Sequence, residues 1–267
     1  MEHIVLFDIR LPRMVLGICV GAGLAISGAV MQGLFRNPLA DPGIVGVGAG
    51  AGFGAICAIV LGGFLPVALQ AVLGSYLVSG AAFLGGWWST ILLYRVSTRH
   101  GRTSVATMLL AGIAISALAG AATNTLSYLA DNDMLRRISL WQMGNLQGAS
   151  WDRVGLCALT AAFLAVLIPR EAGALNAMLL GESEARHLGV NVEWLKRRLI
   201  MYSALGVAIS VAVAGVIAFV GLMVPHLIRL LVGPDHRPLL PLSALAGAIL
   251  LVTADALARV VIAPAEL

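Results

Sequence analysis

The sequence predicts an all-α membrane protein, a polytopic bundle of about eight spanning helices that forms a single domain over residues 1–267. Of the 267 residues, 60% are hydrophobic and 11% are charged, and the mean hydropathy is +0.95, outside the range of water-soluble proteins. Long apolar runs alternate with short polar segments that hold arginine and proline. Within the runs, small residues recur at every fourth position, which is typical of helices that pack against each other in lipid.

Each apolar run predicts one helix, and most are long enough to cross the hydrocarbon core. The runs cover residues 14–34, 44–61, 67–94, 104–128, 154–169, 199–220, 221–232 and 239–263. The run 221–232 is short and contains Pro225, which indicates a half-crossing or re-entrant helix.

Small residues predict where these helices touch. The repeats are Gly46, Gly50 and Gly54; Gly48 and Gly52; Gly17 and Gly21; and Gly112, Ser116 and Gly120.

The distribution of arginine and lysine predicts which side each loop faces. With residue 1 outside, the inner loops hold eleven of these residues and the outer side six. The bias therefore places the N-terminal residue outside and the loop of residues 170–198 in the cytoplasm. That loop predicts a short helix, a break at Gly189 and a second short helix from about Val192. Its mixture of polar and apolar residues favours a surface that docks on another protein, and an ordinary solvated loop is the alternative.

Motifs for catalysis, metal binding and nucleotide binding are absent, so an enzyme is not expected. The single lysine, Lys196, is not part of a P-loop, and the three cysteines lack the spacing of a metal site. The basic residues form no stripe of the kind that binds nucleic acid. Asp255 stands four residues before Arg259, which predicts a local ion pair rather than a proton relay. His236 is expected to be a solvated loop residue.

Several long motifs resemble one family in register along the whole chain. They are Arg10-Leu-Pro-Arg13, Ala25–Gln32, Arg36-Asn-Pro-Leu-Ala-Asp-Pro-Gly43, Leu180–Gly189, Phe219–His226, Asp235-His-Arg237 and Ala265-Glu-Leu267. The chain resembles permease subunits of the iron-siderophore, haem and vitamin B12 ABC importers (the FecCD type of type II importer), and most of all the haem permeases. That family has ten helices, and this chain is similar to helices two to nine, so the first and last helices are expected to be missing.

The resemblance implies an assembly in the bacterial inner membrane. It consists of a homodimer of the permease, two cytoplasmic ABC ATPase subunits and a periplasmic binding protein, and it involves no nucleic acid. ATP is hydrolysed by the partner subunit, so this chain is expected to bind no cofactor and no metal. ATP-driven alternating access would then move the cargo across the membrane.

The resemblance also implies roles for particular residues. Arg10, Arg13 and Arg259 match arginines that dock the binding protein, with simple interfacial anchoring as the alternative. The coupling residues that would meet the ATPase are Leu180, Gly181, Glu182, Glu184, Arg186, His187, Leu188 and Gly189. The residues expected to line the translocation path are Asn124, Ser127 and Tyr128, although serine in a helix often bonds back to its own backbone.

The expected cargo is haem, with a ferric siderophore and then cobalamin as alternatives. Tyr128 and Met134 are the only candidates for a haem-iron ligand, and both are weak. A transporter that works without ATP would need an inverted repeat or acidic residues at mid-membrane, and neither is seen. A non-functional truncated subunit is a third possibility.

Overall fold

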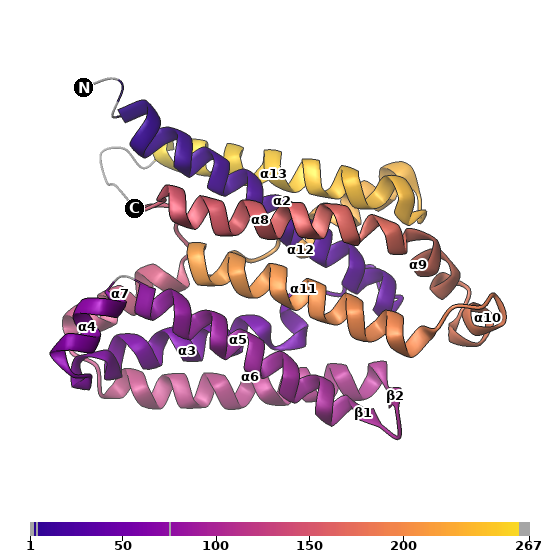
Figure 1. The fold of residues 1–267 in the computed structure, drawn as a ribbon, viewed down its shortest axis with the longest axis horizontal. Helices are drawn as coiled ribbons and strands as arrows, with labels where there is room; N and C mark the ends of the chain where they lie inside the picture. Colours follow the sequence, from indigo (N-terminus) through magenta and orange to yellow (C-terminus); the bar gives the residue numbers. More distant parts are fainter. Residues whose placement is uncertain (1–2, 4, 75, 262–267) are drawn as a thin grey trace. The chain divides into compact units, whose positions relative to one another are not determined.

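The computed structural model describes residues 3, 5–74 and 76–261. Nearly all of them are helical (Figure 1). The helices are α2 (Leu11–Phe35), α3 (Val47–Leu61), α4 (Val67–Leu73), α5 (Tyr76–Ser97), α6 (Val105–Tyr128), α7 (Asn132–Gln142), α8 (Trp151–Leu167), α9 (Ala172–Leu179), α10 (Glu182–His187), α11 (Val192–Ala214), α12 (Val220–Val232) and α13 (His236–Val261). A π-helical turn (Val5–Arg10) precedes α2, and 3₁₀ turns cover Pro42–Val45, Gly62–Phe64 and Pro169–Glu171. Among the described residues, the only strands are β1 (Thr98–Arg99) and β2 (Arg102–Thr103).

The predicted fold class is confirmed, because seven of the described helical segments are long and apolar enough to cross a membrane. Their bounds are Val5–Phe35, Val47–Phe64, Tyr76–Ser97, Val105–Tyr128, Trp151–Leu179, Val192–Ala214 and His236–Val261. The remaining apolar run, residues 221–232, forms α12, which has only 13 residues and contains Pro225. It is too short to span the hydrocarbon core, as its sequence predicts.

One apolar run divides in a way that hydrophobicity did not predict. Residues 67–94 form two helices, α4 and α5, because α4 ends at Gly74 with a φ of 44°. Glycine adopts this left-handed conformation without steric cost, so the chain turns there.

Serine and aspartate side chains cap the helices of the middle of the chain. Ser104, Asp131 and Ser150 accept hydrogen bonds from the backbone N–H three residues ahead, at the starts of α6, α7 and α8. Such caps satisfy amide groups that have no partner within the helix. The polar segments between apolar runs therefore fix where these helices begin.

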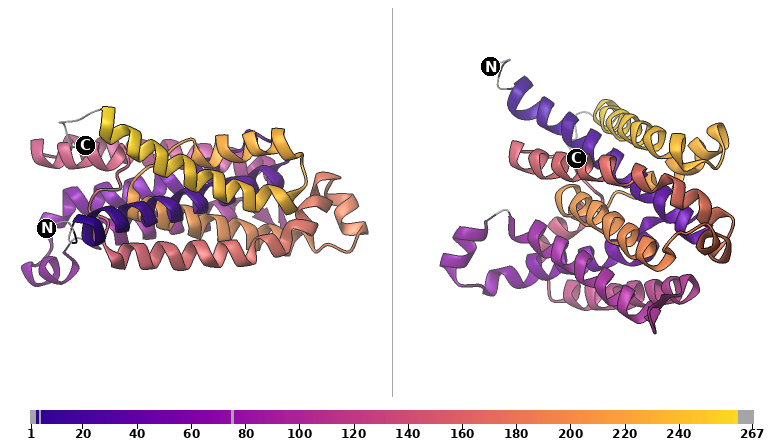
Figure 2. Two further views of the ribbon diagram at one scale, coloured as in Figure 1. Left: turned by 90° about the horizontal axis from the view of Figure 1, so that it is seen from above. Right: turned by 45° about the vertical axis from the view of Figure 1, so that its right-hand side comes forward.

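The described helices group into two compact units, and the first contains Met1–Pro42, Asn145–Gly206 and Ala218–Leu267. Within it α2 packs against α8, α9, α12 and α13, and Figure 2 shows α2 and α13 running alongside each other. The backbones of Gly21 and Gly247 meet so closely that a Cβ on either residue would collide with the other's carbonyl oxygen. The contact predicted for Gly21 is thereby confirmed.

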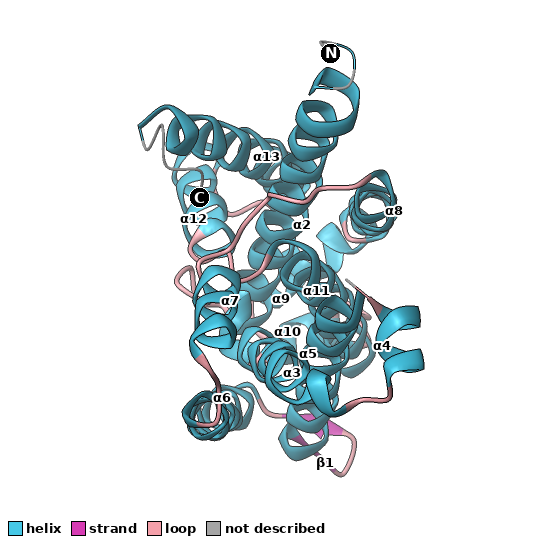
Figure 3. Cartoon of the chain, turned by 90° about the vertical axis from the view of Figure 1, so that its left-hand side faces the viewer, coloured by secondary structure: helices cyan, strands magenta, loops and turns pink. Residues whose placement is uncertain are grey.

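The second unit contains Gly43–Gly144 and Val207–Ile217, so α11 contributes to both units. Helices α3, α5 and α6 pack against one another, and α7 contacts α3 (Figure 3). A Cβ on Gly50 would lie 2.5 Å from the carbonyl oxygen of Gly85, which confirms the contact predicted for Gly50. For Gly48 and Gly120 the prediction was wrong, because a Cβ there would meet no described atom within 4 Å.

Candidate functional site

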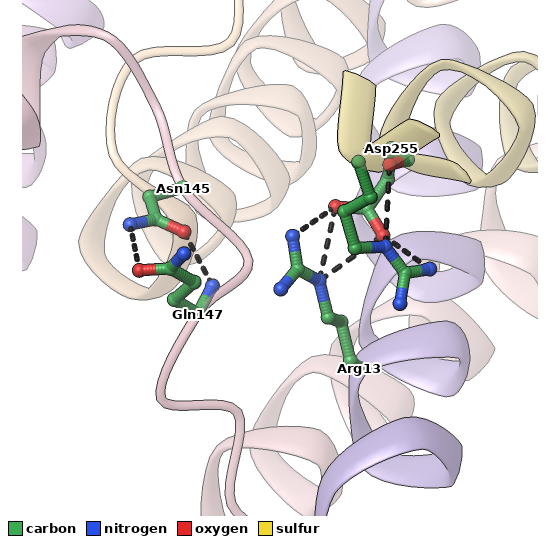
Figure 4. Close-up of polar contacts among 5 residues, drawn as sticks. Arg13, Asn145, Gln147 and Asp255 are labelled. Atoms are coloured by element: carbon green, nitrogen blue, oxygen red, sulfur yellow. Dashed lines mark hydrogen bonds and ion pairs between the residues drawn. The ribbon is translucent and has the colours of Figure 1, made fainter. Parts of the chain in front are cut away.

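An arginine–aspartate cluster joins the start of α2 to the end of α13. The carboxylate of Asp255 accepts hydrogen bonds from Arg13 Nε at 3.0 Å and from Arg13 Nη2 at 2.6 Å (Figure 4). Arg259 Nη2 lies 3.1 Å from the second carboxylate oxygen. The predicted pair of Asp255 and Arg259 is confirmed, but sequence reasoning missed Arg13, which lies 242 residues away.

The three side chains of this cluster differ in their access to solvent. The side chains of Arg13 and Asp255 are 15% and 13% exposed, whereas that of Arg259 is 44% exposed. Arg10, in the turn before α2, is exposed and makes no ion pair with any described residue. Of the three arginines predicted to dock a binding protein, Arg13 and Arg259 both pair with Asp255, and Arg10 makes no such pair. The side chains of Arg10 and Arg259 are exposed, whereas that of Arg13 is mostly covered.

A second group of charges lies at the opposite ends of these helices, in the segment from α9 to the start of α11. Lys196 Nζ lies 2.6 Å from Glu182 Oε1 and 3.7 Å from Glu193 Oε1. Arg186 Nη2 lies 3.3 Å from Glu182 and 3.4 Å from Glu193. Because the Lys196 side chain is only 3% exposed, this network fixes α10 against α11.

Glycines shape this segment on either side of α10. Gly181 has a φ of 122° and Gly189 a φ of 84°, both in the region that favours glycine. The predicted break at Gly189 is confirmed. The second short helix predicted from Val192 was wrong, because Val192 begins the 23-residue α11.

The predicted coupling residues differ in whether they take part in the charge network. Glu182 and Arg186 belong to it, although Arg186 is 48% exposed, whereas Glu184 and His187 are exposed and lie outside it. Leu180 and Leu188 are 67% and 65% exposed, so this chain does not bury them. Two exposed leucines beside a rigid, charge-braced helix form a surface suited to a protein partner.

Asn176 in α9 ties this segment to the start of α13. Its Oδ1 accepts the backbone N–H of His236 at 2.9 Å, and its Nδ2 donates to Asp235 Oδ1 at 2.6 Å. The backbone N–H of Arg237, with the Asn176 amide, holds the pKa of the Asp235 carboxyl below its ordinary value. His236 was expected to be solvated, which was wrong: it is fully buried, with Nδ1 2.9 Å from Asn176 Oδ1.

The residues predicted to line a translocation path lie at the end of α6. Asn124 is exposed and Tyr128 is 90% exposed, so neither is packed within the described chain. Ser127 Oγ donates to the backbone oxygen of Thr123 at 2.9 Å. This is the bond to its own helix that was the alternative to a role in the pathway. A pathway along this helix stays a prediction.

Comparison with known proteins gives a consistent result. The model of the FecCD transport family matches residues 1–267. The hemin transport system permease HmuU of Yersinia pestis is 48% identical over 267 residues, covering 100% of this chain and 78% of that protein. The cobalamin import permease BtuC of Halobacterium salinarum is 44% identical over 257 residues, covering 96% of this chain and 67% of that protein. A solved metal-chelate type ABC transporter in an inward-facing conformation matches with a TM-score of 0.90 and 35% identity, covering 100% of this chain and 82% of that one.

Proposed function

The chain belongs to the FecCD transport family, and from that premise we propose that it carries haem across the bacterial inner membrane. As a permease subunit of an ABC importer it is not an enzyme, and a separate subunit hydrolyses ATP. The proposal adds a homodimer and ATP-driven alternating access to this family assignment. ATPase subunits and a substrate-binding protein are the partners that such a permease requires.

Haem is favoured by the similarity to a hemin permease over the whole of this chain. The 44% identity with a cobalamin permease supports cobalamin as an alternative, and the metal-chelate transporter supports a ferric siderophore. The described residues contain no group of three or more His, Cys, Asp or Glu side chains that could hold a metal ion. We assign much of the selection of the cargo to the binding protein, as the family resemblance implies.

The segment from Leu180 to Gly189 carries the coupling part of the proposal. The ion pairs of Lys196 with Glu182 and Glu193 brace α10, so a force applied to it is passed to α11 rather than absorbed by a flexible loop. Leu180 and Leu188 supply exposed apolar contacts for a cleft in the ATPase. Closure of the ATPase dimer would then move α10 and α11 together.

At the other end, Arg10 and Arg259 supply positive charge for acidic residues of a binding protein. Asp255 holds Arg13 in place, so Arg13 serves the docking surface by fixing the start of α2 beside Arg259. A charged rim of this kind increases the rate of encounter and its dependence on salt more than the affinity itself.

The test is ATPase activity in liposomes that contain the permease, its ATPase and its binding protein. We expect haem-loaded binding protein to stimulate hydrolysis, and Arg10→Glu to reduce this stimulation without reducing basal hydrolysis. Arg137→Glu is the matched control, because Arg137 is also an exposed arginine and has no proposed role.

Each alternative predicts a different result in the same assay. Stimulation only by a siderophore-loaded or cobalamin-loaded binding protein would show that haem is not the cargo, and it would leave the proposed mechanism unchanged. Failure of any ATPase to associate with the permease would contradict the coupling role of Leu180–Gly189. Equal loss of stimulation in the Arg10 and Arg137 variants would contradict the docking role.

A further inference from the structure

The charges of the second unit are distributed very unevenly. Between Asp41 and Asp131 the sequence contains no acidic residue, and its only arginines or lysines are Arg95, Arg99 and Arg102. All three side chains are exposed, at the end of α5 and in the hairpin that follows. None of them makes an ion pair with a residue that the structure describes.

Neutralisation from elsewhere in this unit is ruled out by distance. Its acidic residues, Asp131 and Asp133, follow the far end of α6. The 24 residues of that helix span about 36 Å, several times the Debye length of about 8 Å at physiological salt. The counter-charge of the three arginines therefore does not come from within this unit.

The hairpin holds two of these arginines directly opposite each other. Its antiparallel register pairs Arg99 with Arg102 and Thr98 with Thr103, whose hydroxyl oxygens lie 3.0 Å apart. The turn between the strands is made by His100 and Gly101, with φ values of 49° and 72°. Two central residues with positive φ are characteristic of the tight two-residue hairpin turn, so the register is fixed.

In this register the two opposed arginines repel each other, and a bound anion would relieve that repulsion. Side chains of directly opposed residues lie on the same face of a strand pair, and like charges there are destabilising. A phosphate group placed between Arg99 and Arg102 would replace repulsion by attraction. Guanidinium groups match phosphate geometry with paired N–H donors, which favours a phosphate over a simple halide ion.

The position of the hairpin indicates where such a phosphate would come from. It connects α5 and α6, both long and apolar enough to cross a membrane. Leu92 and Val96 of α5 are 45% and 47% exposed, and Leu110 of α6 is 70% exposed. These apolar surfaces adjoin the arginines at the ends of two membrane-spanning helices, which is the level at which lipid headgroups lie.

We propose that the hairpin Thr98–Thr103, together with Arg95, binds the headgroup of an anionic phospholipid. The phosphate lies between Arg99 and Arg102, and the acyl chains cover the exposed residues Leu92, Val96 and Leu110. A zwitterionic lipid fits less well, because its ammonium group would be repelled by three arginines. The proposal is independent of the cargo and of the ATPase.

The experiment titrates the purified full-length chain in detergent with phosphatidylglycerol or phosphatidylcholine of identical acyl chains, and native mass spectrometry counts the bound lipids. For the wild type we expect preference for phosphatidylglycerol. For Arg99→Gln with Arg102→Gln we expect that preference to fall about 30-fold. Each arginine near an anionic surface contributes a factor of about 5, and the variant removes two of them. Arg136→Gln with Arg137→Gln, exposed arginines of α7 near Asp131 and Asp133, is the control of equal charge change and should keep the wild-type preference.

A second variant separates paired hydrogen bonding from charge alone. Arg99→Lys with Arg102→Lys keeps the charge but loses the guanidinium forks, so a preference between those of wild type and the glutamine variant is expected. It also keeps the test decisive if the glutamine variant does not fold. Equal lipid preference in wild type and both hairpin variants would overturn the proposal. Displacement of phosphatidylglycerol by an equal concentration of inorganic phosphate would also overturn it, because the site would then bind a free anion.

Discussion

Replacing Asp255 with asparagine is expected to destabilise the protein through Arg13. The substitution keeps the size of the side chain but removes the charge to which Arg13 donates three hydrogen-bond contacts. Arg13 then holds a positive charge in a site where its side chain is only 15% exposed. A desolvated charge that loses its partner is strongly unfavourable.

The size of the effect follows from the exposure of each partner. Removing one member of a fully buried ion pair costs about 3–5 kcal/mol. Because Arg13 and Asp255 keep some contact with solvent, we expect a cost of about 2–3 kcal/mol, just below that range. In the pair of Asp255 with Arg259, the arginine side chain is 44% exposed, so this pair adds less than about 1 kcal/mol to the cost of the substitution.

The assay is thermal unfolding of the detergent-purified chain, followed by tryptophan fluorescence. With about 2–4 °C for each kcal/mol in chains of comparable length, Asp255→Asn should lower the Tm by about 4–12 °C. Arg13→Gln should lower it by a similar amount and Arg259→Gln by about 4 °C or less. The double variant of Arg13 and Asp255 should show a coupling of about 2 kcal/mol.

The reasoning would be refuted if Arg13→Gln were no more destabilising than Arg259→Gln. A coupling below about 0.5 kcal/mol in the double-mutant cycle would refute it equally, because contacting residues of one network are expected to depart from additivity.

Three further predictions concern other parts of the chain. Gly50→Val should destabilise the protein by about 1–3 kcal/mol or more, since its Cβ would meet the Gly85 backbone, whereas Gly48→Val should change the Tm little. Leu180→Ser with Leu188→Ser should weaken ATPase association in a pull-down without lowering the Tm, because both leucines are exposed. The Asp235 carboxyl has a lowered pKa, so its stabilisation is present above the ordinary aspartate pKa and is lost as the pH falls below about 4. The difference in Tm between wild type and Asp235→Asn should therefore be present at pH 7 and shrink in acid.

The spanning helices could be predicted from sequence because most of the apolar runs are long enough to cross the hydrocarbon core. The short helix α12 followed from the same reasoning, since its run is interrupted by Pro225. The division at Gly74 could not be predicted, because a glycine inside an apolar run has no distinguishing mark until its φ is known. Of the small-residue repeats, Gly50 meets another helix and Gly48 does not, because spacing alone does not tell which side of a helix faces a neighbour.

The polar contacts were predictable only where both partners are close in sequence. The pair of Asp255 and Arg259 follows from i,i+4 spacing, whereas Arg13 enters from the other end of the chain. His236 looked like a loop residue, and it is buried because Asn176 of α9 binds its backbone and ring. Such contacts depend on how helices pack, which the local sequence does not specify.

Within the first unit, these long-range contacts give α13 a fixed relation to α2. Arg13 and Asp255 join the two helices at one end, and the backbones of Gly21 and Gly247 meet further along. At its start, α13 is held to α9 by Asn176, and α9 leads directly into α10. A displacement of the segment beside α10 therefore reaches α13 through hydrogen bonds to its first turn, and α2 through an ion pair and a backbone contact. Because side chains at both ends of α13 are committed to these contacts, α2 and α13 are expected to move as one body during transport.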